Sequence, residues 1–262
     1  MRQTLQPQQI IERHSNAHSL WVQLFSHERD TYVVPGDAGL VILQEENHRK
    51  FSLAEYLRSF SPEGSGDHIA MSPLEDRTLT SMLSLGIVSD LQKLPEAIPD
   101  RFSIRAAKNL RFDDLRDGNA ILLGSSYSNP WDEVFSDRLN FHFACDPRDN
   151  RQWIVNQHPL AIESPTYGSA GAVSSHRTYA VLAFLPNLNR TGHVLLVQGL
   201  DAAGTRAAAD MLFDRDALRP ILTKALAANG ALRSFELLIE ATSLNPNSHA
   251  IDGRIVASRI YQ

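Results

Sequence analysis

Residues 120–135 read Ala-Ile-Leu-Leu-Gly-Ser-Ser-Tyr-Ser-Asn-Pro-Trp-Asp-Glu-Val-Phe. A short apolar run ends in Gly124, and a small polar loop and a helix start follow it. Asn129 is a preferred N-cap residue and Pro130 suits the first helical position. Asp132 and Glu133 then place negative charge in the first turn, where the helix dipole favours it. The stretch therefore predicts a strand, a loop placed to offer backbone N–H groups to an anion, and a helix that reaches residue 138.

Strand-like and helix-like segments alternate on both sides of this unit. Residues 31–34 are expected to form a strand that turns at 35–37 and continues as an extended piece at 40–44. Helices are expected at 52–60, 72–91, 202–213 and 216–228, and further strands at 102–107, 141–144, 152–156, 179–185, 193–198, 235–241 and 251–261. The alternation predicts an α/β fold, a three-layer Rossmann-like mixed sheet with a mainly parallel centre and an antiparallel C-terminal hairpin.

The chain divides into a tail or linker stub at residues 1–18 and a single α/β domain at 19–262, within which 19–100 is an optional small N-terminal lobe. The opening residues are polar and contain no apolar core of signal-peptide length. No window approaches the roughly 18 apolar residues of a membrane span, so no span is expected. Residues 164–175 are rich in Ser, Gly and Ala and are expected to form a long mobile loop. A plain connection is the preferred interpretation of this loop, and a lid over the crevice is the alternative.

The composition of the 262 residues is that of an ordinary packed protein, with a formal net charge of −5. Basic residues are scattered, so direct nucleic-acid binding is not expected. The single cysteine, Cys145, excludes a disulfide within the chain and a cysteine-rich zinc site. The histidines show no metal-binding spacing, and neither a metal nor a cofactor is predicted. The low cysteine count fits a reducing compartment and an extracytoplasmic bacterial domain alike. The compartment is left open, with the cytoplasm preferred and the soluble part of a membrane-tethered protein as the alternative.

The loop after the 120–123 strand is the first candidate ligand site. In open α/β sheets, ligands bind beyond the carboxyl ends of the strands. Gly124 would let a ligand approach the backbone, while Ser125, Ser126, Ser128 and Asn129 offer short polar contacts. The alternative is a plain strand-to-helix turn with a good cap, because the dinucleotide-binding spacing G-x-G-x-x-G is absent.

The second candidate is the loop at residues 198–206, Gln-Gly-Leu-Asp-Ala-Ala-Gly-Thr-Arg. The spacing from Gly199 to Gly204 imitates a phosphate-binding P-loop, but Thr205 stands where the lysine should be. Triphosphate hydrolysis by the usual route is therefore not expected. Arg206 remains suited to hold a phosphate or a carboxylate.

The two loops are expected to form one polar crevice if their strands are parallel neighbours. Asp37, which follows the strand at 31–34, joins the crevice in this interpretation; the simpler interpretation of Asp37 as a turn residue is preferred. A bulky residue in place of Gly124 or Gly199 is expected to abolish binding and leave the fold intact.

Three segments resemble a known domain: residues 118–131, Gly-Asn-Ala-Ile-Leu-Leu-Gly-Ser-Ser-Tyr-Ser-Asn-Pro-Trp; residues 139–143, Leu-Asn-Phe-His-Phe; and residues 193–209. The domain is poorly characterised, occurs in soil bacteria, notably acidobacteria, and lies beside winged-helix DNA-binding modules. The resemblance covers roughly residues 19–262. It implies a sensory or effector domain of a transcriptional regulator, although this chain contains no recognisable winged helix.

The preferred interpretation is a ligand-sensing domain that binds a small anionic or nucleotide-like molecule without turning it over. The alternative is an enzyme that acts on a nucleotide or a glycosidic bond. In that case Asn129 would orient the substrate and the carboxylate would come from Asp37, Asp146, Asp201 or Glu133.

A third interpretation is a protein–protein interaction module with Trp21, Trp131 and Trp153 as interface anchors. Burial of these tryptophans in the core is the simpler explanation for them. A homodimer is one assembly that the sequence allows.

Overall fold

The computed structural model describes residues 19–59, 77–146, 148, 151–168, 177–243 and 251–261. Its strands are β1 (Thr31–Val34), β2 (Phe102–Ile104), β3 (Asn119–Leu123), β4 (Phe141–Asp146), β5 (Arg151–Asn156), β6 (Thr166–Tyr167), β7 (Arg177–Pro186), β8 (His193–Gly199), β9 (Phe235–Ser243) and β10 (Ile251–Ile260). Its α-helices are α2 (Ala38–Asn47), α3 (Leu53–Ser59), α4 (Met82–Gln92), α5 (Phe112–Asp117), α6 (Ala202–Phe213) and α7 (Arg215–Ala225).

The main sheet has seven strands in the order β10-β9-β7-β8-β3-β1-β2. The four strands β2, β1, β3 and β8 run parallel to one another. The long strand β7 is antiparallel to both of its neighbours, β8 and β9, and β10 pairs antiparallel with β9. The fold is therefore α/β with a mixed, mostly parallel sheet and an antiparallel C-terminal hairpin, as the sequence predicts.

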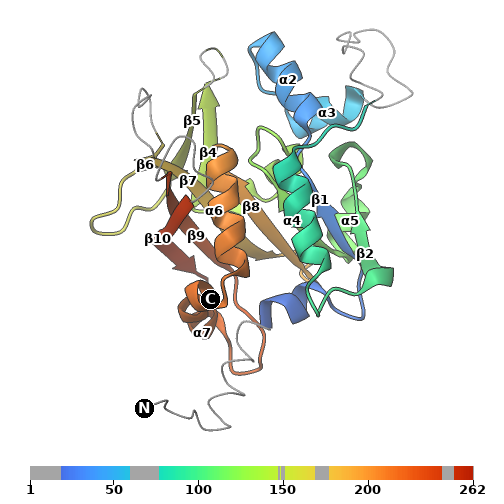
Figure 1. Ribbon diagram of the computed structural model, residues 1–262, viewed down its shortest axis with the longest axis vertical. Coiled ribbons are helices and arrows are strands. Elements are labelled where there is room, and N and C mark those ends of the chain that lie inside the picture. The colour runs from blue at the N-terminus through green and yellow to red at the C-terminus, as the bar shows by residue number, and fades with distance from the viewer. Residues whose placement is uncertain are drawn as a thin grey trace.

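Helices and a second, smaller sheet cover the two faces of the main sheet (Figure 1). On one face, α4 and α6 bury Ile87 and Ala208 in a cluster that includes Leu195 of β8. On the other face, α2 and α5 contribute Leu40 and Leu115 to a separate cluster. The antiparallel sheet β4-β5-β6 lies over this second face and adds Phe141 and Ile154 to its cluster. Apolar side chains thus cover both faces of the central strands, which explains why those strands read as continuous apolar runs.

The prediction of an extended segment at residues 40–44 is wrong, because these residues lie in the helix α2. The Asp37 carboxylate caps this helix, accepting hydrogen bonds from Gly39 N at 2.9 Å and Leu40 N at 3.3 Å. Leu40 and Leu43 are buried at helical spacing, so an N-cap and one buried face outweigh the strand-like look of Leu-Val-Ile-Leu.

The long helix expected at 72–91 begins later than predicted. Residues 72–76 lie outside the described part of the chain, residues 77–81 are not helical, and α4 starts at Met82. The Ser81 hydroxyl is the actual cap and accepts a hydrogen bond from Ser84 N at 3.1 Å. The preceding residues instead reach across to the end of β1, where Thr80 Oγ1 donates to Gly36 O at 2.9 Å.

The helix predicted at 130–138 is also corrected, because this segment forms two short 3₁₀ helices, Pro130–Val134 and Ser136–Arg138. Asn129 does not cap it. Its side-chain Nδ2 donates instead to Val34 O at 3.1 Å and to Leu123 O at 3.3 Å. Asn129 therefore joins the ends of β1 and β3.

Part of the proposed lid lies outside the described residues, since the structure describes 164–168 and resumes at 177. Within the expected loop, Thr166–Tyr167 forms the short edge strand β6. Among the helices of the described ranges, none combines the length and apolar character that crossing a membrane requires.

Candidate functional site

The central strands of the main sheet contain a point at which the chain reverses its winding. From β1 the chain passes through α2 and α3, which pack on one face, and then through α4, which packs on the opposite face, to β2. From β2 it returns through α5 to β3, which lies on the other side of β1. After β1 the chain thus continues to β2 toward one edge of the main sheet, and after β3 it continues to β7 toward the other edge. In open α/β sheets ligands bind at such a reversal point.

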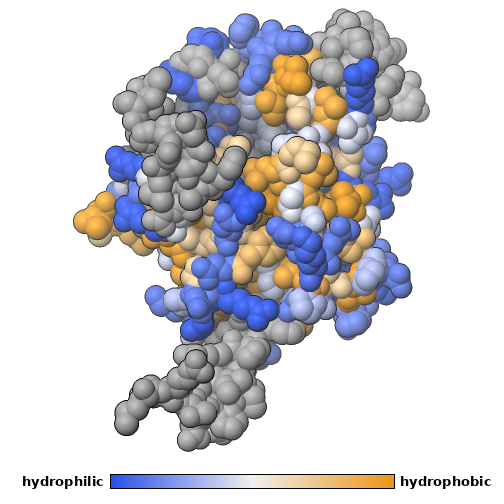
Figure 2. Space-filling view, viewed as in Figure 1, coloured by the Kyte–Doolittle hydropathy of each residue, from blue (hydrophilic) through white to orange (hydrophobic). Residues whose placement is uncertain are grey.

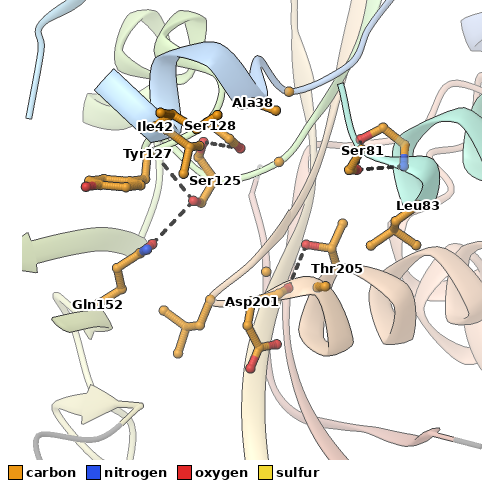
Figure 3. Close-up of a pocket in the computed structure, with 17 residues that line it drawn as sticks. Ala38, Ile42, Ser81, Leu83, Ser125, Tyr127, Ser128, Gln152, Asp201 and Thr205 are labelled. Carbon is orange, nitrogen blue, oxygen red and sulfur yellow. Dashed lines mark hydrogen bonds between the residues drawn. The ribbon is translucent and has the colours of Figure 1, made fainter. Parts of the chain in front are cut away.

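A crevice of about 390 Å³ lies at this point, within the size range of small-molecule sites. The loops that follow β1, β3 and β8 form its floor, and α2, α4 and α6 form its sides (Figure 3). The β3 and β8 strands are parallel neighbours, paired from Ala120 with Val194 to Leu123 with Val197. The two candidate loops therefore open onto the same edge of the sheet.

Three helices begin at the crevice, each with its own side-chain cap. Asp37 caps α2 and Ser81 caps α4, while the Asp201 carboxylate caps α6 by accepting a hydrogen bond from Gly204 N at 2.7 Å. Converging N-termini favour negative charge in the space between them. The two aspartates already supply part of that charge, and the first N–H groups of α2 are hydrogen-bonded within the protein, Ala38 N to Leu79 O at 3.1 Å.

The polar side chains of the crevice come from several distant segments. Ser125 and Ser128 lie in the loop after β3, Gln152 in β5 and Thr205 in the first turn of α6. The Ser125 hydroxyl and Gln152 Oε1 are 3.5 Å apart, and Thr205 Oγ1 donates to Asp201 O at 3.0 Å. These groups give the crevice several short hydroxyl and amide contacts in positions set by the backbone.

The remaining walls are apolar, so the crevice is less polar than the sequence predicts. Val41 and Ile42 face it from α2, Leu83 from α4 and Leu200 from the loop after β8. Figure 2 shows apolar surface gathered where α2 and α4 lie. Ile42 of α2 is 37% exposed. None of the described residues that line the crevice is a lysine or an arginine.

Glycines at the crevice and in the first turn of α6 allow neighbouring segments to approach closely. A Cβ atom on Gly199 would lie 2.1 Å from Thr205 N, and one on Gly204 would lie 2.6 Å from Tyr179 O. Gly124 has a φ of +94°, and a Cβ there would lie 2.2 Å from Ser128 Oγ. The expectation that Gly124 or Gly199 could be enlarged without harm to the fold is therefore wrong on steric grounds.

Five of the predicted site residues do not line the crevice. Asp37 caps α2, and Gly204 lies in the first turn of α6. Asn129 is fully buried between β1 and β3, Ser126 lines a different cavity, and Arg206 forms an ion pair of 2.8 Å with Asp210 on its own helix. The loop also uses its own N–H groups: Ser128 N and Asn129 N donate to Ser125 O at 2.9 and 2.8 Å. The predicted anion contacts are thus largely committed to the loop itself.

The carboxylates considered for catalysis have structural partners. Asp37 and Asp201 cap helices, and Glu133 Oε2 accepts a hydrogen bond from Leu53 N at 2.9 Å. Hydrogen bonds from Arg148 lower the pKa of Asp146, which favours its ionised form. A general acid needs a raised pKa, so the lowered pKa of Asp146 does not suit that role.

Sequence reasoning missed the residues that reach the crevice from other segments. Val41 and Ile42 were missed because α2 was expected to be extended, and Ser81 and Leu83 because α4 was expected to start earlier. Gln152 was missed because a strand of the second sheet gives no sign of where it will pack. Among these missed residues, only Ser81, the cap at the start of α4, carried a recognisable signal.

Within the described residues, no group of three or more His, Cys, Asp or Glu side chains is placed to hold a metal ion. Comparison of the chain with protein-family models, with curated proteins and with solved structures found no match.

Proposed function

We propose that this chain is a ligand-binding domain that holds a small metabolite in the crevice between α2, α4 and α6. The observation that carries the proposal is a cavity of small-molecule size at the reversal point between β1 and β3. In a Rossmann-like sheet, ligands bind at the corresponding point. The resemblance to domains beside winged-helix modules supports a sensory role in transcriptional regulation.

The lining favours one part of the predicted ligand class, a nucleoside-like molecule of low charge. Val41, Ile42, Leu83 and Leu200 suit the faces of a flat ring, and the serine and glutamine side chains suit hydroxyl and amide groups. With Asp201 at the wall and no basic residue among the described lining residues, a triphosphate would lack a countercharge. An uncharged nucleoside avoids that cost.

Isothermal titration with adenosine, guanosine, cytidine and uridine, and with their 5′-triphosphates, tests this proposal. At least one nucleoside should bind, and its triphosphate should bind about tenfold more weakly or worse, because uncompensated charge is costly to desolvate. Lack of binding by all four nucleosides at millimolar concentration would contradict the proposal.

The variant Ile42→Glu should weaken nucleoside binding by about tenfold or more, since it places a charge against the ligand. Leu85→Glu is the matched control, because Leu85 is an exposed residue of α4 that does not line the crevice. Equal losses in both variants would point to a general effect on the fold. Product analysis after incubation with each nucleoside and with NAD distinguishes binding from turnover, and we expect the compounds to be recovered unchanged.

A further inference from the structure

A second cavity, of about 260 Å³, shares two segments with the crevice. Ser126 and Gln198 line this cavity, whereas their neighbours Ser125 and Gly199 line the crevice. Alternation along β8 explains the difference, because successive side chains of a strand point to opposite faces of the sheet. The second cavity therefore lies on the face that carries the small sheet.

Two polar atoms buried at this cavity have no hydrogen-bond partner among the described residues: Asp132 Oδ1 and Gln198 Oε1. Both side chains are almost fully buried, Asp132 at 4% exposure and Gln198 at 1%. The two side chains are hydrogen-bonded to each other, because Gln198 Nε2 donates to Asp132 Oδ2. Buried polar atoms are rarely left unpaired, so a pair of them on the wall of one cavity indicates a site for a ligand or for water.

A lysine lines the same cavity. Lys50 Nζ donates to Ser126 Oγ at 3.0 Å, and no carboxylate of the described chain forms a salt bridge with it. Burial raises the pKa of Asp132 well above its usual range, although the charge of Lys50 opposes this shift. The raised pKa favours the neutral form of Asp132. A neutral carboxyl group can donate a hydrogen bond as well as accept one.

We propose that this cavity is a second ligand site, which binds a small carboxylate that carries a hydroxyl or amino group on the neighbouring carbon. Lys50 and Ser126 donate to the carboxylate of the ligand. Gln198 Oε1 accepts a hydrogen bond from the neighbouring hydroxyl or amino group, and the neutral Asp132 donates through Oδ1. Leu139 and Phe143, which also line the cavity, contact the apolar part of the ligand.

Isothermal titration with 2-hydroxyisovalerate tests this site, with isovalerate and 2-hydroxyisovaleramide as comparisons. The hydroxy acid should bind, and each comparison compound should bind about tenfold more weakly or worse, because isovalerate lacks the hydrogen-bond donor and the amide lacks the charge. A cavity that holds only water would give no heat with any of the three compounds, and this result would overturn the proposal.

Lys50→Met should weaken binding of the hydroxy acid by at least about tenfold, because a charged hydrogen bond is lost. Lys93→Met, at an exposed lysine outside the cavity, should leave it unchanged, and so should Ile42→Glu in the crevice. Binding that survives Lys50→Met, or that Ile42→Glu removes, would contradict the assignment to this cavity.

The role of Asp132 has a separate test in the pH dependence of binding. The other titratable groups lining the cavity are Lys50, Glu133 and His142. Binding to the wild type should weaken as pH rises and Asp132 ionises, because two carboxylates then face each other. Asp132→Asn should keep binding and lose this part of the pH dependence; an unchanged pH profile would overturn the role of Asp132.

Discussion

Replacing Gly199 by alanine should lower the free energy of unfolding by about 3 kcal/mol, the upper end of the usual cost of overpacking. The added Cβ would lie 2.1 Å from Thr205 N and 2.6 Å from the carbonyl carbon of Gly204. Both are backbone atoms in the first turn of α6, so no side-chain rotation can relieve the contact. Relief requires α6 to move away from β8, which would open the core that the two elements share.

Urea denaturation measures this loss, and Gly86→Ala is the control. Gly86 lies inside α4, and a Cβ there meets nothing within 4 Å. Alanine at this position should raise stability by about 0.5–1 kcal/mol, because glycine is unfavourable inside a helix. Unchanged stability in Gly199→Ala would show that the loop can relax, and the glycine would then be better explained by the approach of a ligand.

The presence of strands could be anticipated where apolar runs are long and unambiguous. The runs that form β3, β7, β8 and β9 predict buried strands, and the hairpin of β9 and β10 follows from a turn-rich connection. The sequence Ser52-Leu-Ala-Glu55 is typical of a capping box, and one forms at the start of α3: Ser52 N donates to Glu55 Oε2 at 2.9 Å, and Glu55 N donates to Ser52 Oγ at 3.2 Å.

Local patterns failed where tertiary contacts chose between two compatible structures. A run such as Leu-Val-Ile-Leu suits a strand and a buried helix alike, and the Asp37 cap decides for a helix. Asn129 looks like a cap, yet its amide is used between β1 and β3. The sequence places Asp132 in the first turn of a helix, where an exposed charge is expected. In the structure its partner is Gln198 of β8, and no local pattern indicates this contact.

The same limit applies to the crevice. Its floor was predictable, because glycines that end apolar strands mark the carboxyl edge of a parallel sheet. Its sides were not, because the first turns of α2 and α4 and the residue Gln152 arrive from segments far apart in the sequence. The apolar character of the crevice comes largely from these sides.

Replacing Glu236 by alanine should cost about 4 kcal/mol, because buried donors would lose their acceptor at about 1–3 kcal/mol each. Glu236 is fully buried on β9. Its carboxylate accepts hydrogen bonds from Asn140 N at 2.8 Å and Phe141 N at 3.0 Å, and from the hydroxyl of Tyr261. Since β4 begins at Phe141, this one side chain ties the small sheet to the main sheet.

Two measurements locate that loss. Urea denaturation gives its size, and hydrogen exchange at the Asn140 and Phe141 amides should accelerate more than exchange within β8. Tyr261→Phe, which removes one donor and leaves both amides paired, should cost only about 1 kcal/mol. A loss as large in Tyr261→Phe as in Glu236→Ala would assign the stabilisation to the C-terminal strand instead.

The pH dependence of stability separates the hydrogen bonds of Glu236 from its charge. Burial raises the pKa of Glu236 above its usual value of 4.5, although its hydrogen bonds oppose the shift. A raised pKa means that the folded protein binds the proton more tightly than the unfolded chain, so the contribution of Glu236 is greatest below pH 4.5 and declines as pH rises through the folded pKa. Glu236→Gln cannot ionise, so its stability relative to wild type should improve as pH rises above 4.5 and become constant above the folded pKa of Glu236. A difference that stays constant over this range would show that Glu236 has the same pKa in the folded and unfolded chain.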